Sequence, residues 1–170
     1  NIKSKWGSAI YGYGASCNTN VSSHVPEPHA VTSANGQHYC YNRNGSMVSG
    51  AGRDIQWSSF GKPEAFYKAS SNHRINFEYG SDRRRVRRID DKNGSVTTTT
   101  YVGSYEKVEQ AGSIDERHYI GGFLVVSKKT QGEIVSIKDN YILKDNLGSV
   151  VAYIDPTQIG SPERTSFDPW

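Results

Sequence analysis

Short runs of β-forming residues, separated by turn residues at intervals of about ten residues, follow one another along most of the chain. Ile55, Trp57 and Ser59 alternate with Asp54, Gln56 and Ser58, which is the period of two expected for a strand with one covered face. Glycine, asparagine, aspartate and proline separate these runs, and no segment shows apolar residues at helical spacing. The pattern predicts an all-β chain built from antiparallel β-hairpins.

The clearest hairpin is predicted at Tyr141–Pro156. It contains two apolar runs, at 141–143 and 150–154, which are joined by a turn that begins at Asp145. An Asn-Gly turn at 42–45 predicts a second hairpin of the same kind. Because one strand–turn–strand unit recurs with different residues, we expect the chain to be a series of similar hairpins.

The composition is typical of a folded chain with a thin core. Only 35% of the residues are hydrophobic, but eleven Tyr, five Phe and three Trp are spread along the sequence, which argues against disorder. The net charge of +3 gives little indication of an acidic partner. No apolar run approaches the roughly 18 residues of a membrane helix.

We expect a single β-repeat segment over residues 1–170, with a polar, proline-containing loop at 15–30. The sequence begins and stops within the repeating pattern, at Asn1 and Trp170. This position of the ends predicts that the chain is a segment of a larger protein.

The most highly charged stretch of the chain is residues 83–89. Read as a strand, it places Arg83, Arg85 and Arg87 on one face with Ile89, and its other arginines on the opposite face. A nucleic acid could use such a stripe. Four acidic residues lie beside it, however, and favour a solvated strand whose arginines form ion pairs and protect a sheet edge. They are Glu78, Asp82, Asp90 and Asp91. We do not expect a nucleic-acid partner.

The two cysteines, Cys17 and Cys40, leave alternatives open. They form a disulfide if the protein is exported, or they are two unpaired thiols, because spacing alone does not establish the geometry of a bridge. Either thiol beside a histidine would resemble a nucleophilic dyad, but no defining motif is present. Three histidines, His24, His29 and His38, match no defined zinc spacing, so solvated loop histidines are favoured over a metal site.

Three aspartates are the remaining candidates for chemistry. Asp145, Asp155 and Asp168 each precede a turn or a proline, and we interpret them as turn residues because aspartate bonds the local backbone. The sequence contains neither a Gly-x-Ser-x-Gly elbow nor a P-loop. We therefore predict no catalytic residue, no cofactor and no metal, and a protein that is not an enzyme.

Several motifs occur in one order along residues 31–170, and together they resemble the RHS/YD-repeat family, close to its repeat-associated core segment. They are Tyr39-x-Tyr41-Asn42-x-Asn44-Gly45-x-Met47, Phe77-x-Tyr79-Gly80-x-Asp82-Arg83-x-Arg85, Tyr101-Val102-Gly103-x-Tyr105-Glu106-Lys107-Val108, Glu116-Arg117-His118-Tyr119-Ile120, Tyr141-Ile142-x-x-Asp145-Asn146-Leu147-Gly148-Ser149-Val150 and Phe167-Asp168-Pro169-Trp170. The sequence departs from the signature at Asn42, where aspartate is usual, and at Asn146, where histidine is common. Both replacements keep turn-forming chemistry.

The resemblance implies YD-type hairpin repeats that form part of a curved sheet or a hollow β-shell. In bacterial members, such as Tc-type toxin C subunits and exported RHS effectors, the shell encloses a toxic C-terminal segment. It therefore implies a structural segment of a secreted or cell-surface virulence protein, with the rest of the shell and the enclosed toxin as partners. The aspartyl self-cleavage site of bacterial members would lie beyond Trp170.

A second function remains open, that of a β-rich recognition module that binds carbohydrate or a partner protein at a cell surface. Trp57 or another exposed aromatic residue is the candidate for such binding, and its replacement by alanine would test it. Because isolated hairpins leave strand edges unpaired, we also expect self-association of the chain through its edge strands.

Overall fold

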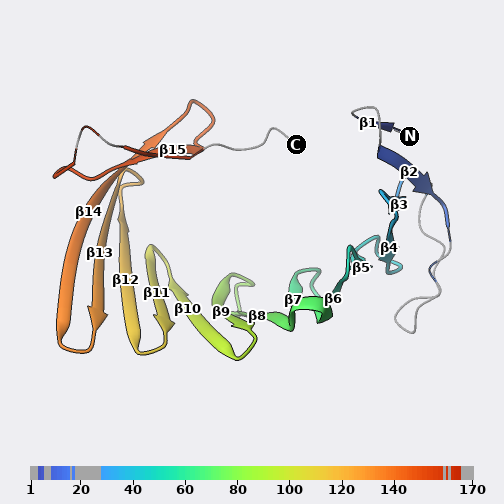
Figure 1. Cartoon of the computed structure of the whole chain (residues 1–170), viewed down its shortest axis with the longest axis horizontal. Helices are drawn as coiled ribbons and strands as arrows, with labels where there is room; N and C mark the ends of the chain where they lie inside the picture. The colour runs from blue at the N-terminus through green and yellow to red at the C-terminus, as the bar shows by residue number, and fades with distance from the viewer. Residues whose placement is uncertain are drawn as a thin grey trace. The chain divides into compact units, whose positions relative to one another are not determined.

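The computed structural model describes residues 4–5, 9–15, 17, 28–158, 160 and 162–165. Within them the chain forms sixteen strands and one short 3-10 helix, η1 (Ala69–Ser71), and contains no α-helix. The strand order follows the sequence order from β1 to β16, as expected for consecutive hairpins. The prediction of an all-β chain of antiparallel hairpins is confirmed (Figure 1).

The chain divides into two compact units. Unit 1 comprises residues 1–78 and 90–94, and unit 2 comprises residues 79–89 and 95–170. The strands of unit 1 are β1 (Ser4–Lys5), β2 (Ala9–Tyr13), β3 (Val31–Ala34), β4 (Gln37–Tyr41), β5 (Met47–Gly50), β6 (Arg53–Trp57), β7 (Pro63–Lys68) and most of β8 (His73–Tyr79). Those of unit 2 are β10 (Ser95–Val102), β11 (Tyr105–Gln110), β12 (Ser113–Ile120), β13 (Leu124–Gln131), β14 (Ile134–Lys144), β15 (Val150–Ile154) and β16 (Glu163–Arg164), and β9 (Arg85–Lys92) contributes to both units.

One five-residue turn recurs at four places in the described residues. In each, the first residue's N–H donates to the fifth residue's carbonyl, and the fourth residue's N–H donates back to the first carbonyl, with distances between 2.8 and 3.1 Å. The turns span 42–46, 58–62, 80–84 and 145–149. Residues 42–45 and 145–149 confirm the predicted hairpin turns, and the recurrence supports a repeated unit.

In three of the four turns, the side chain at the first position holds the turn closed. Asn42 Oδ1 accepts hydrogen bonds of 3.0 Å from the backbone N–H groups of Asn44 and Ser46. Asp145 Oδ1 accepts from the equivalent groups of Leu147 and Ser149, at 2.9 and 2.8 Å. Aspartate and asparagine are interchangeable here because each supplies one oxygen that reaches the backbone two residues on.

The fourth position of the turn has a left-handed backbone. Glycine occupies it in three turns, and Arg83 occupies it in the fourth with φ of 60°. The predicted basic strand is therefore wrong at its start: Arg83 and Arg84 belong to the turn, and β9 begins at Arg85. Arg84 pairs locally with Asp82, at 3.5 Å, and both side chains are exposed.

Arg83→Gly should raise the free energy of unfolding by about 1 kcal/mol, since an L-residue in the left-handed region costs about 1–2 kcal/mol. The matched change Gly148→Ala should lower it by a similar amount. A Cβ at Gly148 meets nothing within 4 Å, so that cost comes from the backbone alone. Urea denaturation monitored by circular dichroism measures both, and a destabilised Arg83→Gly would contradict the argument.

The core of unit 1 is small and surrounds a disulfide. Cys17 and Cys40 are bonded, with Cα atoms 5.4 Å apart, and they form a buried cluster with Val48. Trp57 packs against this cluster and donates a 2.8 Å hydrogen bond from Nε1 to the Met47 carbonyl. The structure thus selects the bridge from the two alternatives for the cysteines.

Unit 2 is a series of long hairpin arms in which β10 to β14 lie side by side (Figure 1). The apolar run predicted at 141–143 lies near the end of a longer strand, β14, which begins at Ile134, and the second hairpin arm is β15. Among the described residues of this unit, its buried hydrophobic residues are Val125, Ile142 and Ala152. The predicted thin core is confirmed for these arms.

Candidate functional site: a polar groove in unit 2

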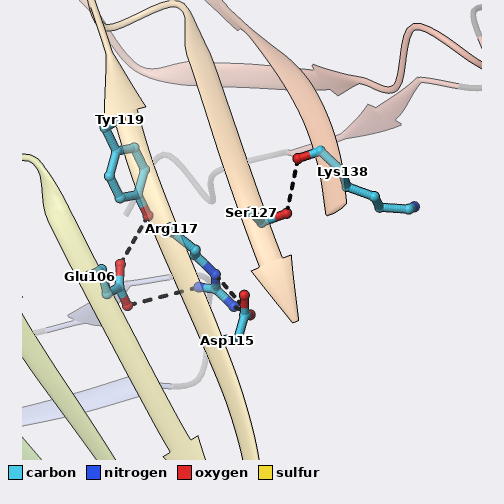
Figure 2. A network of polar contacts seen from close by, with 6 residues as sticks. All are labelled: Glu106, Asp115, Arg117, Tyr119, Ser127 and Lys138. Atoms are coloured by element: carbon cyan, nitrogen blue, oxygen red, sulfur yellow. Dashed lines mark hydrogen bonds and ion pairs between the residues drawn. The ribbon is translucent and has the colours of Figure 1, made fainter. Parts of the chain in front are cut away.

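The strand register of unit 2 brings a row of polar side chains together on one face. Glu106 on β11 lies opposite Arg117 on β12, which lies opposite Ser127 on β13, which lies opposite Lys138 on β14. Residues two positions apart on a strand share a face. Asp115 and Tyr119 therefore flank Arg117 on the same face, as Figure 2 shows.

Arg117 is held between two carboxylates. Its Nε and one terminal nitrogen donate to Asp115 Oδ2, at 3.0 and 2.5 Å, and its other terminal nitrogen lies 3.8 Å from Glu106 Oε1. The Tyr119 hydroxyl donates to the second Glu106 oxygen, at 2.9 Å. These contacts, drawn in Figure 2, fix the direction of the guanidinium across β11 and β12.

The environment keeps the two donors of this network, Arg117 and Tyr119, in their donor forms at neutral pH. Burial acts to lower the pKa of Arg117, but the hydrogen bonding and charge of Asp115, together with the charge of Glu106, outweigh it and raise that pKa. Burial, followed by the hydrogen bond to Glu106, raises the pKa of Tyr119. The guanidinium stays charged and the phenol stays neutral, so both remain donors.

A groove follows this row and has a cavity volume of about 390 Å³. Its floor is formed by residues of β12, β13 and β14, and Tyr153 of β15 and Glu163 of β16 line it as well. The Thr165 hydroxyl donates to the Val150 carbonyl, which ties the chain after β16 to β15. A second hollow of about 320 Å³ shares Asp115 and Arg117 with the groove and extends along β12 to Ser113.

The opposite face of these arms carries a separate polar cluster. The Tyr105 hydroxyl donates to Glu116 at 2.9 Å, Lys128 lies 3.6 Å from the same carboxylate, and the Tyr105 ring packs on His118 with centroids 4.8 Å apart. The hydrogen bond from Tyr105 lowers the pKa of Glu116. This face also exposes apolar side chains on β14, among them Ile137 and Tyr141.

The residues considered for chemistry lie apart from this groove or serve as turn residues. The bond between Cys17 and Cys40 leaves neither as a thiol nucleophile. In the described part of the chain, which includes His29 and His38, no group of three histidine, cysteine or acidic residues is placed to hold a metal ion. His24 and Asp168 lie outside the described residues.

Asp145 and Asp155 act as the sequence predicts, by accepting hydrogen bonds from the backbone that follows them. The hydrogen bonds of Thr157, from its side chain and then its backbone, lower the pKa of Asp155. Lys138 pairs with the same carboxylate at 3.3 Å, which links this turn to the edge of the groove.

The suggestion that Trp57 is an exposed binding aromatic is wrong. Its ring is partly buried against the disulfide cluster, and its indole N–H is used by the Met47 carbonyl. The aromatics at the groove are Tyr119 and Tyr153 instead. Tyr119 belongs to the motif at residues 116–120, but the sequence does not show that it lies near Tyr153. That grouping depends on strand register and on the position of β15.

The Asp145 carboxylate should make the free energy of unfolding depend on pH in the acid range. The Ser149 backbone hydrogen bond, with others in the turn, lowers the pKa of Asp145 below its ordinary value of 3.8. A lowered folded-state pKa contributes stability above the unfolded value and loses it as pH falls through the folded value. Between about pH 5 and pH 2, the urea midpoint of Asp145→Ala should therefore fall less than that of the wild type.

The control for this titration is Asn146→Ala, which changes the same turn without removing a carboxylate. It should keep the pH dependence of the wild type. Equal pH dependence of Asp145→Ala and the wild type would show that the turn carboxylate contributes nothing to acid unfolding.

Comparison with known proteins shows the fold. No family model matches the chain, and no curated protein matches it. Among solved structures the chain is similar to a chain of "Crystal Structure of TcdB2-TccC3-Cdc42", with a TM-score of 0.57 and 17% sequence identity. The match covers 72% of this chain and 7% of that chain. The chain thus spans a small part of the structure that it matches, and the likeness concerns the hairpin-repeat fold.

The structure contains no helix, within the residues described, with the length and apolar character needed to cross a membrane.

Proposed function

We propose that the chain is a structural segment of an RHS-repeat shell that encapsulates a C-terminal toxin and helps to deliver it. The observation that carries the proposal is the likeness of its hairpin fold to a chain of TcdB2-TccC3, a Tc toxin complex. The four equivalent turns support it, because they give the repeated strand–turn–strand unit a structural definition beyond its varied sequence.

The packing of the arms fits a wall better than an independent globular domain. No described side chain is less than 2% exposed, so each hairpin buries little apolar area by itself. Hairpins of this kind become stable when neighbouring units share their faces and edges. The partners in this proposal are the remainder of the parent shell and the enclosed toxin, and the protein is an exported bacterial virulence factor without enzymatic activity in this segment.

Electron cryomicroscopy of the protein encoded by the complete reading frame tests the proposal. We expect residues 31–158 to form hairpins in the wall of a closed shell, with density for a separate segment inside. Limited proteolysis should leave that segment intact until the shell is opened by denaturant. Hairpins that form an external appendage, or a shell with no enclosed segment, would overturn the encapsulating role.

The chain expressed by itself should self-associate. The strand order ends at β1 and β16, each with a single neighbouring strand within the described residues, and an unpaired edge is a template for another chain. The weight-average sedimentation coefficient should therefore rise with protein concentration. A constant coefficient, together with cooperative unfolding, would contradict the open-edge picture.

A further inference from the structure

We propose that the groove of unit 2 is a binding site for a neutral saccharide. The groove is lined by Arg117, Tyr119, Ser127, Asn140, Tyr153 and Glu163, among others. This assignment is independent of the shell proposal, since it rests on one face of β12 to β16.

The volume and shape of the groove suit a small ligand. Its volume of about 390 Å³ falls within the range of about 300–1,000 Å³ that is common for small-molecule sites. Residues of five strands converge on it, and β15 and β16 contribute Tyr153 and Glu163 beside the flat face of the arms. A disaccharide is of suitable size for such a space.

The lining matches the two kinds of surface that a pyranose presents. Sugar hydroxyls both donate and accept, and the groove offers an amide at Asn140, a hydroxyl at Ser127 and a carboxylate at Glu163. The C–H face of a sugar ring packs on an aromatic ring, and Tyr119 and Tyr153 both line the groove. Tyr119 is 36% exposed, so part of its ring is open to a ligand.

The charge arrangement favours a neutral ligand over an anion. Both cations of the groove already have carboxylate partners: Arg117 is paired with Asp115 and Glu106, and Lys138 lies 3.3 Å from Asp155. Glu163 adds a further negative charge to the lining. An anionic sugar would be repelled by these carboxylates, whereas a neutral sugar would not.

Hydrogen bonds within the network also hold the lining side chains in position before a ligand binds. Arg117 and Tyr119 are held in place by Asp115 and Glu106 before any ligand arrives (Figure 2). Ser127 donates to the Lys138 carbonyl at 3.2 Å and is likewise fixed in position. Side chains ordered in advance reduce the entropy lost on binding.

Calorimetric titration of the whole 170-residue chain with lactose, cellobiose and N,N′-diacetylchitobiose tests the assignment, with sialyllactose as the anionic probe. We expect at least one neutral disaccharide to bind with a Kd of about 1 mM, measured with ligand up to about 10 mM. Tyr153→Ala should weaken that binding about ten-fold, equivalent to about 1.4 kcal/mol. Asn140→Ala should weaken it as well.

The matched control is Tyr141→Ala, which removes an exposed tyrosine from β14 next to Asn140 in sequence but on the opposite face. It should leave the Kd unchanged. Tyr153→Phe keeps the ring, so it should retain most of the affinity if Tyr153→Ala fails to fold. Absence of binding by every neutral disaccharide, stronger binding of sialyllactose, or equal losses in Tyr141→Ala and Asn140→Ala would each overturn the proposal.

Discussion

Replacing both Cys17 and Cys40 by serine should lower the free energy of unfolding of unit 1 by about 3 kcal/mol. The bond joins residues 23 apart in sequence, and closing a loop of this length restricts the unfolded chain by about that amount. The effect is large for unit 1 because the bonded sulfurs form, with Val48, its buried cluster. Urea denaturation followed by far-ultraviolet circular dichroism measures the loss.

Reduction provides the control for the cysteine variant. Dithiothreitol should shift the midpoint of the wild type toward that of the double serine variant and leave the variant itself unchanged. If the wild type unfolds at the same urea concentration with and without reductant, the bridge contributes nothing to stability. A shift of the variant on reduction would point to an effect of the reductant elsewhere in the chain.

Local chemistry explains why the hairpins could be predicted from the sequence. Asn42 and Asp145 close their turns through hydrogen bonds to residues two and four positions on, and such contacts lie within the sequence window that pattern analysis uses. The alternation of exposure along a strand is also a local property. It is predicted correctly at Ile55, which is buried, and at Gln56, which is exposed. The predicted alternation is wrong at Ser58 and Ser59, because β6 ends at Trp57 and Ser58, which is buried, opens another five-residue turn.

The start of the basic strand could not be predicted by composition. Three of the four turns have glycine at the left-handed position, so the arginine at position 83 conceals the fourth turn from a search for glycine. Asp82 replaces the missing first-position side chain by accepting from the Arg84 N–H at 3.0 Å, because Gly80 has none. This turn has its capping aspartate at the third position and an arginine in place of glycine at the fourth. A sequence pattern based on the usual positions therefore does not identify it as a turn.

The groove was beyond prediction for a different reason. Glu106 and Arg117 are eleven positions apart, and Tyr153 is a further thirty-six positions on, so their grouping depends on the register of successive arms. A one-residue slip in any arm would move its side chains to the other face. Sequence periodicity indicates that two faces exist, but it does not say which residues of different strands share one.

Trp57→Ala should lower the free energy of unfolding of unit 1 by about 3 kcal/mol, the lower part of the range for removing a large aromatic from a core. The lower value is expected because the ring is only partly buried. Two losses combine: contacts with the disulfide cluster, and the hydrogen bond from the indole to the Met47 carbonyl. Circular dichroism in urea is the suitable measurement, because the change also removes a fluorophore.

Two further variants separate these contributions. Trp57→Phe keeps much of the ring contact and loses the hydrogen bond. The lost hydrogen bond should lower the free energy of unfolding by about 1 kcal/mol, in addition to the effect of the smaller ring. Tyr67→Ala, at a 40% exposed ring on β7, should cost much less than Trp57→Ala. Because Trp57 packs against the cluster that contains the bonded cysteines, its replacement in the double serine background should cost less than in the wild type. Strict additivity of the two changes would show that the indole stabilises unit 1 independently of the bridge.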